Sequence, residues 1–81
     1  MEEIRIGQKS KGKYLSAVFY AFQNNHSRVV VSGLGKKVSK AFDVCEEVTN
    51  LLKDVHSSKS ESFEVDGKTG VRITLEKEGI Q

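Results

Sequence analysis

The chain has 81 residues and a formal net charge of +2, which is the size of one small domain spanning residues 1–81. Its single cysteine excludes an intrachain disulfide framework, and no Cys or His pair has the spacing of a zinc site. The cysteine usage fits a reducing, intracellular compartment. No stretch has the length of a membrane span and the N-terminus has no apolar h-region, so we expect no membrane partner, and we expect no cofactor.

The charges are distributed unevenly along the chain. Residues 1–40 hold eight basic and two acidic residues, whereas residues 41–81 hold five basic and nine acidic ones. This asymmetry indicates that one surface faces a polyanion while another is solvated or meets a protein.

The first 25 residues predict a strand followed by a helix. Residues 3–8 alternate apolar and polar positions, as a half-buried strand does, and Gly7 lies near its end. The helix is expected between Ser10 as N-cap and Asn24-Asn25 as stop signal. Its apolar stripe consists of Tyr14, Leu15, Val18, Phe19, Ala21 and Phe22, and we expect Tyr20 to pack in the core as well.

A second strand and helix follow. Residues 28–32 contain three consecutive valines, which favours an interior strand buried on both faces. Gly33 and Gly35 are expected to let the backbone turn sharply into a helix over about residues 36–53. The predicted inner stripe of this helix is Val38, Ala41, Phe42, Cys45, Val48 and Leu52. Leu51, Leu52 and Val55 exceed what one stripe needs, which suggests a contact with a partner chain.

The remaining residues predict a loop and a hairpin. The Ser- and Lys-containing stretch 56–60 is expected to be a connecting loop, followed by short strands at 62–65 and 71–75 joined by a turn at Asp66-Gly67. The fold class is therefore α+β: a β-α-β-α-β-β order with two helices packed on a four-stranded mixed sheet.

The segment that joins the second strand to the second helix predicts a phosphate site. Free N–H groups of a first helical turn bind anions, and Lys36, Lys37 and Lys40 lie there. Lysines oppose the helix dipole at this end, which suggests that an anion compensates them. Lys9, Lys11 and Lys13 lie at the start of the first helix, where solvation is the simpler interpretation from these residues alone.

The sequence does not match other nucleotide-binding or catalytic motifs. Val38 stands where a dinucleotide fingerprint needs its third glycine, and no Walker A spacing occurs. The Gly-Lys-Thr-Gly of residues 67–70 fits a hairpin turn better than the GxxG loop of KH domains. Cys45 lies on an apolar stripe, and no carboxylate is placed to orient His26 or His56. We therefore expect no enzyme and no small-molecule substrate.

Two segments together resemble the Alba family of small nucleic-acid-binding proteins. Residues 4–9 read Ile-Arg-Ile-Gly-Gln-Lys and are followed by Tyr14, similar to the family's Ile-Gly-Lys-Lys and tyrosine. Residues 33–43 read Gly-Leu-Gly-Lys-Lys-Val-Ser-Lys-Ala-Phe-Asp, similar to Ala-Arg-Gly-Arg-Ala-Ile-Ser-Lys-Ala-Val-Asp. Gln8 replaces a lysine of the family pattern, and Leu34 replaces an arginine.

The resemblance implies a homodimer, or a heterodimer with a paralogue, that lays basic loops across DNA or RNA, in chromatin or on RNA. The expected location is then the cytoplasm, a nucleoid or a nucleus. Its hairpin, expected to be much shorter than an archaeal arm, favours compact binding. The expected nucleic-acid-binding residues are Lys9, Lys11, Lys13, Gly33, Gly35, Lys36, Lys37, Lys40 and Arg72. The alternative is a protein-interaction subunit of a ribonucleoprotein, similar to the Alba-like pair of ribonuclease P and MRP particles.

Overall fold

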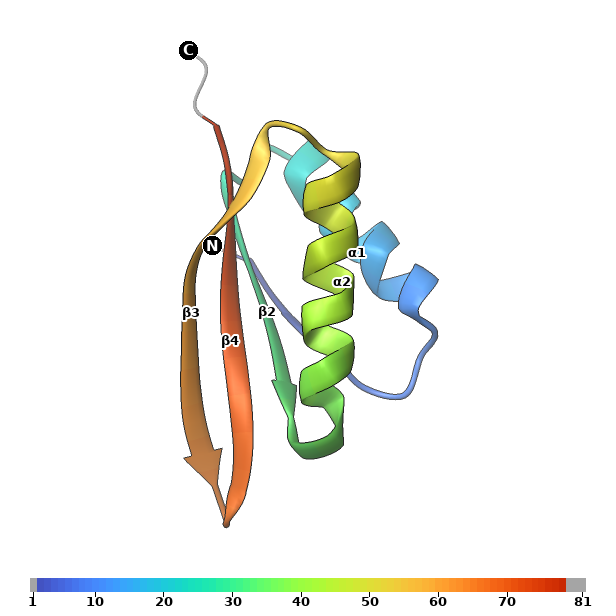
Figure 1. Cartoon of the computed structure of the whole chain (residues 1–81). Coiled ribbons are helices and arrows are strands. Elements are labelled where there is room, and N and C mark those ends of the chain that lie inside the picture. The colour runs from blue at the N-terminus through green and yellow to red at the C-terminus, as the bar shows by residue number, and fades with distance from the viewer. Residues whose placement is uncertain (1, 79–81) are drawn as a thin grey trace.

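The computed structural model describes residues 2–78 and has the predicted order of elements. Strands β1 and β2 are each followed by a helix, and a hairpin of two long strands ends the fold (Figure 1). The elements are β1 (Glu2–Arg5), α1 (Lys11–Gln23), β2 (Arg28–Leu34), a 3₁₀ turn (Gly35–Lys37), α2 (Val38–Leu51), β3 (Val55–Val65) and β4 (Lys68–Lys77).

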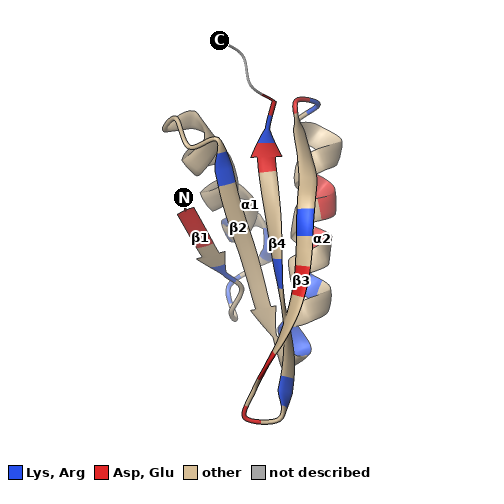
Figure 2. Ribbon diagram, turned by 90° about the vertical axis from the view of Figure 1, so that its left-hand side faces the viewer, with Lys and Arg blue, Asp and Glu red and all other residues tan. Residues whose placement is uncertain are grey.

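The four strands form one mixed sheet in the order β1-β2-β4-β3, which confirms the predicted architecture. β1 and β2 are parallel because α1 crosses over between them, and the other two pairs are antiparallel. Both helices cover the same face of the sheet (Figure 1), and Figure 2 looks onto the opposite face. We call this opposite face the outer face of the sheet.

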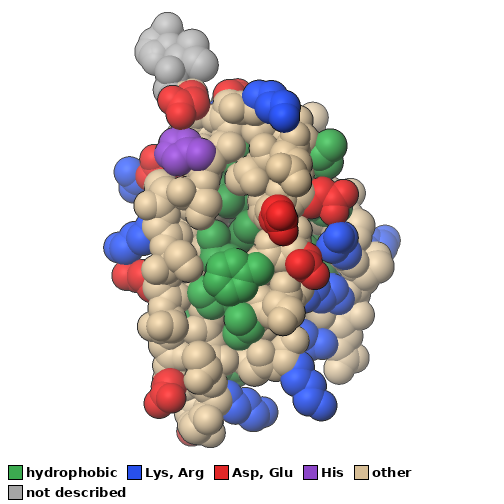
Figure 3. Space-filling view, viewed as in Figure 1, with side chains coloured by type: hydrophobic (Ala, Val, Ile, Leu, Met, Phe, Trp, Pro, Cys, Tyr) green, Lys and Arg blue, Asp and Glu red, His purple; other side chains and the backbone are tan. Residues whose placement is uncertain are grey.

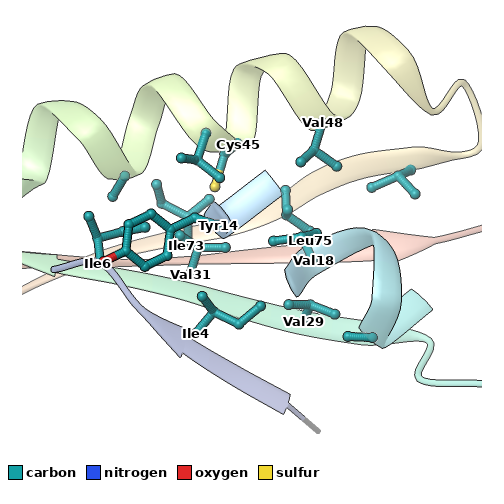
Figure 4. Close-up of a cluster of buried hydrophobic side chains, with 14 of the residues drawn as sticks. Ile4, Ile6, Tyr14, Val18, Val29, Val31, Cys45, Val48, Ile73 and Leu75 are labelled. Atoms are coloured by element: carbon teal, nitrogen blue, oxygen red, sulfur yellow. The ribbon is translucent and has the colours of Figure 1, made fainter. Parts of the chain in front are cut away.

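The core lies between the helices and the inner face of the sheet (Figure 4). β-Branched residues fill much of it. β2 is buried continuously from Val29 to Gly33, as the valine run predicted, whereas on β4 the buried Val71, Ile73 and Leu75 alternate with more exposed residues. The most deeply buried side chains are Val18, Val29, Val31, Val44, Val48, Ile73 and Leu75.

Two aromatic residues assigned to the core are not in it. Phe42 is 47% exposed, and Val44 takes the buried position on α2 together with Val48, four residues later. Phe42 therefore lies at the margin of the buried stripe of α2 and not at its centre. Tyr20 is 69% exposed, so α1 buries Tyr14, Val18 and Phe22 without it.

The predicted loop at residues 56–60 is instead part of β3. β3 is an edge strand, and its inward positions opposite Val71 and Ile73 of β4 are the exposed residues Ser62 and Ser60. Because these inward positions are exposed, they need no apolar side chains, and the strand lacks the apolar alternation from which a strand is predicted.

The hairpin is also longer than predicted. The last β2–β4 pair joins Leu34 to Gly70, whereas β3 and β4 continue pairing to Val65 and Lys68. Residues 64–69 therefore project beyond β2 as a two-stranded arm (Figure 1). The turn at Asp66-Gly67 is confirmed, and both residues have positive φ, 51° and 78°.

Gly33 does not make the turn that the sequence predicted. It lies within β2, paired with Val71, and the left-handed residue is Gly35 with φ 60°. Gly33 is required for a different reason: a Cβ there would lie 2.5 Å from the carbonyl oxygen of Lys37 and 3.1 Å from Cβ of Ala41. The missing side chain lets the start of α2 pack directly on β2.

Gly33→Ala is expected to lower the free energy of unfolding by about 1–3 kcal/mol, because overpacking would push the 3₁₀ turn off β2. Urea unfolding monitored by circular dichroism measures this. Gly12→Ala is the matched control, since a Cβ at Gly12 meets no atom within 4 Å and alanine favours the helix. Equal stability of the two variants would contradict the close packing at Gly33.

Candidate nucleic-acid interface

The buried Tyr14 hydroxyl organises the loop between β1 and α1. It accepts hydrogen bonds from the backbone N–H groups of Gly7, at 2.7 Å, and Lys9, at 3.1 Å. The aromatic ring is fixed in the core, so the hydroxyl holds this loop in one conformation. The tyrosine of the N-terminal motif therefore acts through the backbone of the loop that carries Lys9.

Lys40 joins the same loop to α2. Its ammonium donates hydrogen bonds to the carbonyl oxygens of Lys9 and of Gly7, the latter at 3.5 Å, and lies 5.4 Å from the centre of the Tyr14 ring. Within residues 2–78 no carboxylate lies within 4 Å of this ammonium. The structure thus brings together Lys9 and Lys40, which are 31 residues apart, and Lys40 positions the loop.

Lys36 and Lys37 lie on the 3₁₀ turn that leads into α2, where the sequence predicted them to follow the turning glycine. This turn and the first turn of α2 contain no acidic residue, and no side chain caps either N-terminus. Figure 3 shows Lys and Arg side chains at the end of the molecule where α2 begins. The local potential is therefore positive from both the lysines and the helix dipole.

Lys68 is a further basic residue of this region that sequence reasoning left out of the site. Its Cδ lies 3.9 Å from the position that a Cβ on Gly35 would occupy. The juxtaposition follows from the register that pairs Leu34 with Gly70, which no local pattern reveals. We call Lys9, Lys36, Lys37 and Lys68 the lysine cluster; none of them forms an ion pair within the described part of the chain.

The other predicted basic residues are placed differently. Lys11 forms an ion pair with Glu47 of α2 at 3.0 Å. The Lys11 ammonium donates a hydrogen bond to this carboxylate, and this bond together with the negative charge of Glu47 raises the pKa of Lys11. Lys13 is exposed on α1. Arg72 lies on the outer face of β4, with its guanidinium 4.3 Å from the centre of the Phe63 ring.

The described residues contain no arrangement of titratable groups for catalysis. Cys45 is buried, and this desolvation raises the pKa of its thiol to about 12, so it is not a nucleophile at neutral pH. His26 and His56 are at the surface, beside Glu2 and Glu78. Residues 2–78 hold no cluster of metal ligands. None of the helices described is long and apolar enough to cross a membrane.

A protein-family model described as Alba matches residues 2–62 of the chain. The chain belongs to the Alba family. It is 35% identical over 80 residues to the DNA/RNA-binding protein Alba of Nanoarchaeum equitans, with 93% of this chain and 89% of that protein covered. It is 33% identical over 66 residues to the DNA/RNA-binding protein Alba of Thermoplasma acidophilum, with 82% of this chain and 72% of that protein covered.

Two solved structures share the fold of this chain. Alba from Thermoplasma volcanium superimposes with a TM-score of 0.80 at 27% identity, over 94% of this chain and all of that one. ALBA1 from Trypanosoma brucei has a TM-score of 0.84 at 19% identity, over 95% and 70% of the two chains, and shows the shared fold. Alba proteins are non-enzymatic nucleic-acid-binding proteins, which agrees with the interpretation of Cys45 as a core thiol.

Tyr14→Phe is expected to lower the free energy of unfolding by about 1–3 kcal/mol, because two backbone N–H groups lose their acceptor. Amide hydrogen exchange at Gly7 and Lys9 should accelerate in the folded protein. Tyr20→Phe removes the same atom from an exposed side chain and should change stability by less than about 0.5 kcal/mol. Unchanged exchange at Gly7 and Lys9 would show that the hydroxyl does not hold the loop.

The raised pKa of Cys45 predicts a pH dependence of stability. The unfolded thiol ionises at its ordinary pKa of about 8.5, whereas the folded thiol keeps its proton up to about pH 12. Between these values the unfolded state binds fewer protons, so stability falls by up to about 1.4 kcal/mol per pH unit. Urea unfolding at several pH values should show a steeper alkaline loss for the wild type than for Cys45→Ala. Parallel curves would contradict this assignment.

Proposed function

We propose that this Alba domain binds the phosphate backbone of DNA or RNA through the lysine cluster, largely independently of sequence. The observation that carries the proposal is that four lysines without ion-pair partners among residues 2–78 flank the start of α2. Lys36 and Lys37 lie on the turn before it, Lys40 ties it to the loop of Lys9, and Lys68 of the arm lies beside Gly35. Lysine ammonium groups bind phosphate as point charges, and phosphate contacts carry no direct sequence information.

The lysines have different roles in this proposal. Lys36 and Lys37 contact phosphate beside the open N–H groups of the first turn, and Gly35 supplies the left-handed residue that starts this turn. Lys9 contacts phosphate from a loop that Tyr14 and Lys40 hold in place. Lys13 is a secondary contact, and Lys11 contributes less because Glu47 neutralises it.

We propose further that the whole chain acts as one intracellular domain and binds as a dimer. The exposed Phe42 lies on α2, and Figure 3 shows hydrophobic side chains in the middle of the face that carries α2 and β3. Beside them the uncovered inward positions of β3 are serines, which leave room for a second layer. A second copy of this chain, seated here, would double the number of phosphate contacts.

Binding to duplex DNA is expected to weaken with salt at a log–log slope of about −5 to −7, for six to eight phosphates neutralised by a dimer. Replacing both Lys36 and Lys37 by Gln removes four charges from a dimer and should reduce the slope by about three to four. Fluorescence anisotropy at several salt concentrations measures this for duplex DNA, duplex RNA and single-stranded RNA.

The matched control replaces Lys53 and Lys77 by Gln. This pair carries the same charge but lies beyond the C-terminal end of α2: Lys53 follows the helix, and Lys77 pairs with Val55 at the end of β4. The 14 residues of α2 span about 20 Å. If the salt slope becomes shallower by the same amount in both double variants, net charge and not the lysine cluster governs binding. A wild-type slope near zero would refute backbone binding altogether.

The exposed Phe42 also favours the second function, a protein-interaction subunit of a ribonucleoprotein that pairs with a paralogue. Light scattering on the purified chain separates the two. A stable dimer with salt-dependent binding supports the first function. A folded monomer that binds none of the three nucleic acids, and whose apolar face requires a different partner, supports the second.

A further inference from the structure

The outer face of the sheet carries the three arginines of the chain, and among residues 2–78 two of them have an acidic partner whereas the third has none. Arg5 lies 3.8 Å from Glu3, and Arg28 lies 2.8 Å from Glu76. Arg72 has no carboxylate within 4 Å among residues 2–78. The guanidinium of Arg72 is therefore the arginine charge that this face leaves available to a ligand.

The acidic residue opposite Arg72 is engaged elsewhere. Glu61 pairs with Arg72 across the strands, yet its carboxylate forms an ion pair with Lys59 of its own strand at 3.2 Å. Arg72 instead lies over the ring of Phe63, with 4.3 Å between the guanidinium carbon and the ring centre. This distance is typical of a stacked cation–π pair.

Gly70 fixes the ring under this arginine. Phe63 and Gly70 are cross-strand partners, and a Cβ on Gly70 would lie 2.5 Å and 2.8 Å from the ring atoms Cζ and Cε2 of Phe63. The ring thus lies across the bare backbone of β4, where only glycine leaves it room. The stack of Gly70, Phe63 and Arg72 is held by two strands and not by a mobile loop.

Arg72 itself is exposed, which leaves guanidinium surface that Phe63 does not cover. Proteins bind unpaired bases by stacking them on aromatic rings or on the planes of arginine side chains. Figure 2 shows this part of β4 on the open side of the sheet, away from the helices. A duplex buries its bases in its own stack, so such a surface selects strands whose bases are unpaired.

We propose that Phe63 and Arg72 form a stacking platform for an unpaired nucleobase of single-stranded RNA or DNA. This inference rests on the proposed function, because the lysine cluster supplies the backbone contacts that bring the strand to the outer face. The platform adds a preference for unpaired over paired nucleic acid, which the lysines alone do not provide.

The test compares the wild type with Arg72→Lys, which keeps the charge and loses the plane, and Phe63→Leu, which keeps an apolar side chain over Gly70. The probes are oligouridine, oligodeoxythymidine and a mixed-sequence DNA duplex, each at one fixed salt concentration. Arg72→Lys should lower the ratio of single-strand to duplex affinity about five- to fifty-fold, and Phe63→Leu should lower it in the same direction. A lower affinity ratio with either oligouridine or oligodeoxythymidine supports the platform. The probe with the larger decrease shows whether ribose or deoxyribose is preferred.

Arg28→Lys is the matched control, because Arg28 lies on the same face but is paired with Glu76. It should leave the ratio unchanged. A single strand that contains 2-aminopurine gives a second readout, because stacking on the platform changes the fluorescence of this base. Arg72→Lys should abolish the change. This readout does not depend on Phe63→Leu, so it remains available if that variant fails to fold.

The two proposals fail differently. Salt-dependent binding with an unchanged affinity ratio and unchanged 2-aminopurine signal in Arg72→Lys overturns the platform alone. A wild-type chain that binds neither single strands nor duplex overturns both the platform and the proposed function.

Discussion

The close approach between β2 and the start of α2 at Gly33 is the constraint on which the placement of Lys36, Lys37 and Lys40 depends. With no side chain at Gly33, the carbonyl of Lys37 and Cβ of Ala41 can lie against the strand. Lys36 and Lys37 are thereby held on a tight turn at the end of the sheet, and Lys40 lies one turn later, within reach of the β1–α1 loop. A larger residue at Gly33 would move all three lysines together.

Ion pairing decides which basic residues remain available to a polyanion. A carboxylate lies within 4 Å of Lys11, of Arg5 and of Arg28, and all three ion pairs are at the surface. Such pairs contribute little to the free energy of unfolding, but they balance the positive charge locally. The lysine cluster has no such partners. The modest net charge of the chain therefore understates the potential at the start of α2, because neither the 3₁₀ turn nor the first turn of α2 contains an acidic residue.

The sequence allowed prediction of the order of elements because each helix has one clear stripe and β2 is a continuous apolar run. It failed at β3, an edge strand that carries exposed serines in inward positions and shows no period-two pattern. It failed also at Phe42, since hydrophobicity alone does not tell the centre of a helix stripe from its margin, and Val44 occupies the centre. Gly33 was identified as important but for the wrong reason.

The site shows the same division between local and non-local information. Lys36 and Lys37 follow from a strand, a glycine and a helix start that are adjacent in sequence, so local chemistry suffices to predict them. Lys68 beside Gly35, and Phe63 under Arg72, follow instead from the register of β4 with its two neighbours. A shift of one residue in that register would send Arg72 to the inner face and Val71 to the outer one. The burial of Val71, Ile73 and Leu75 thus fixes the charged chemistry on the opposite face, because the core determines which side of β4 can meet a ligand.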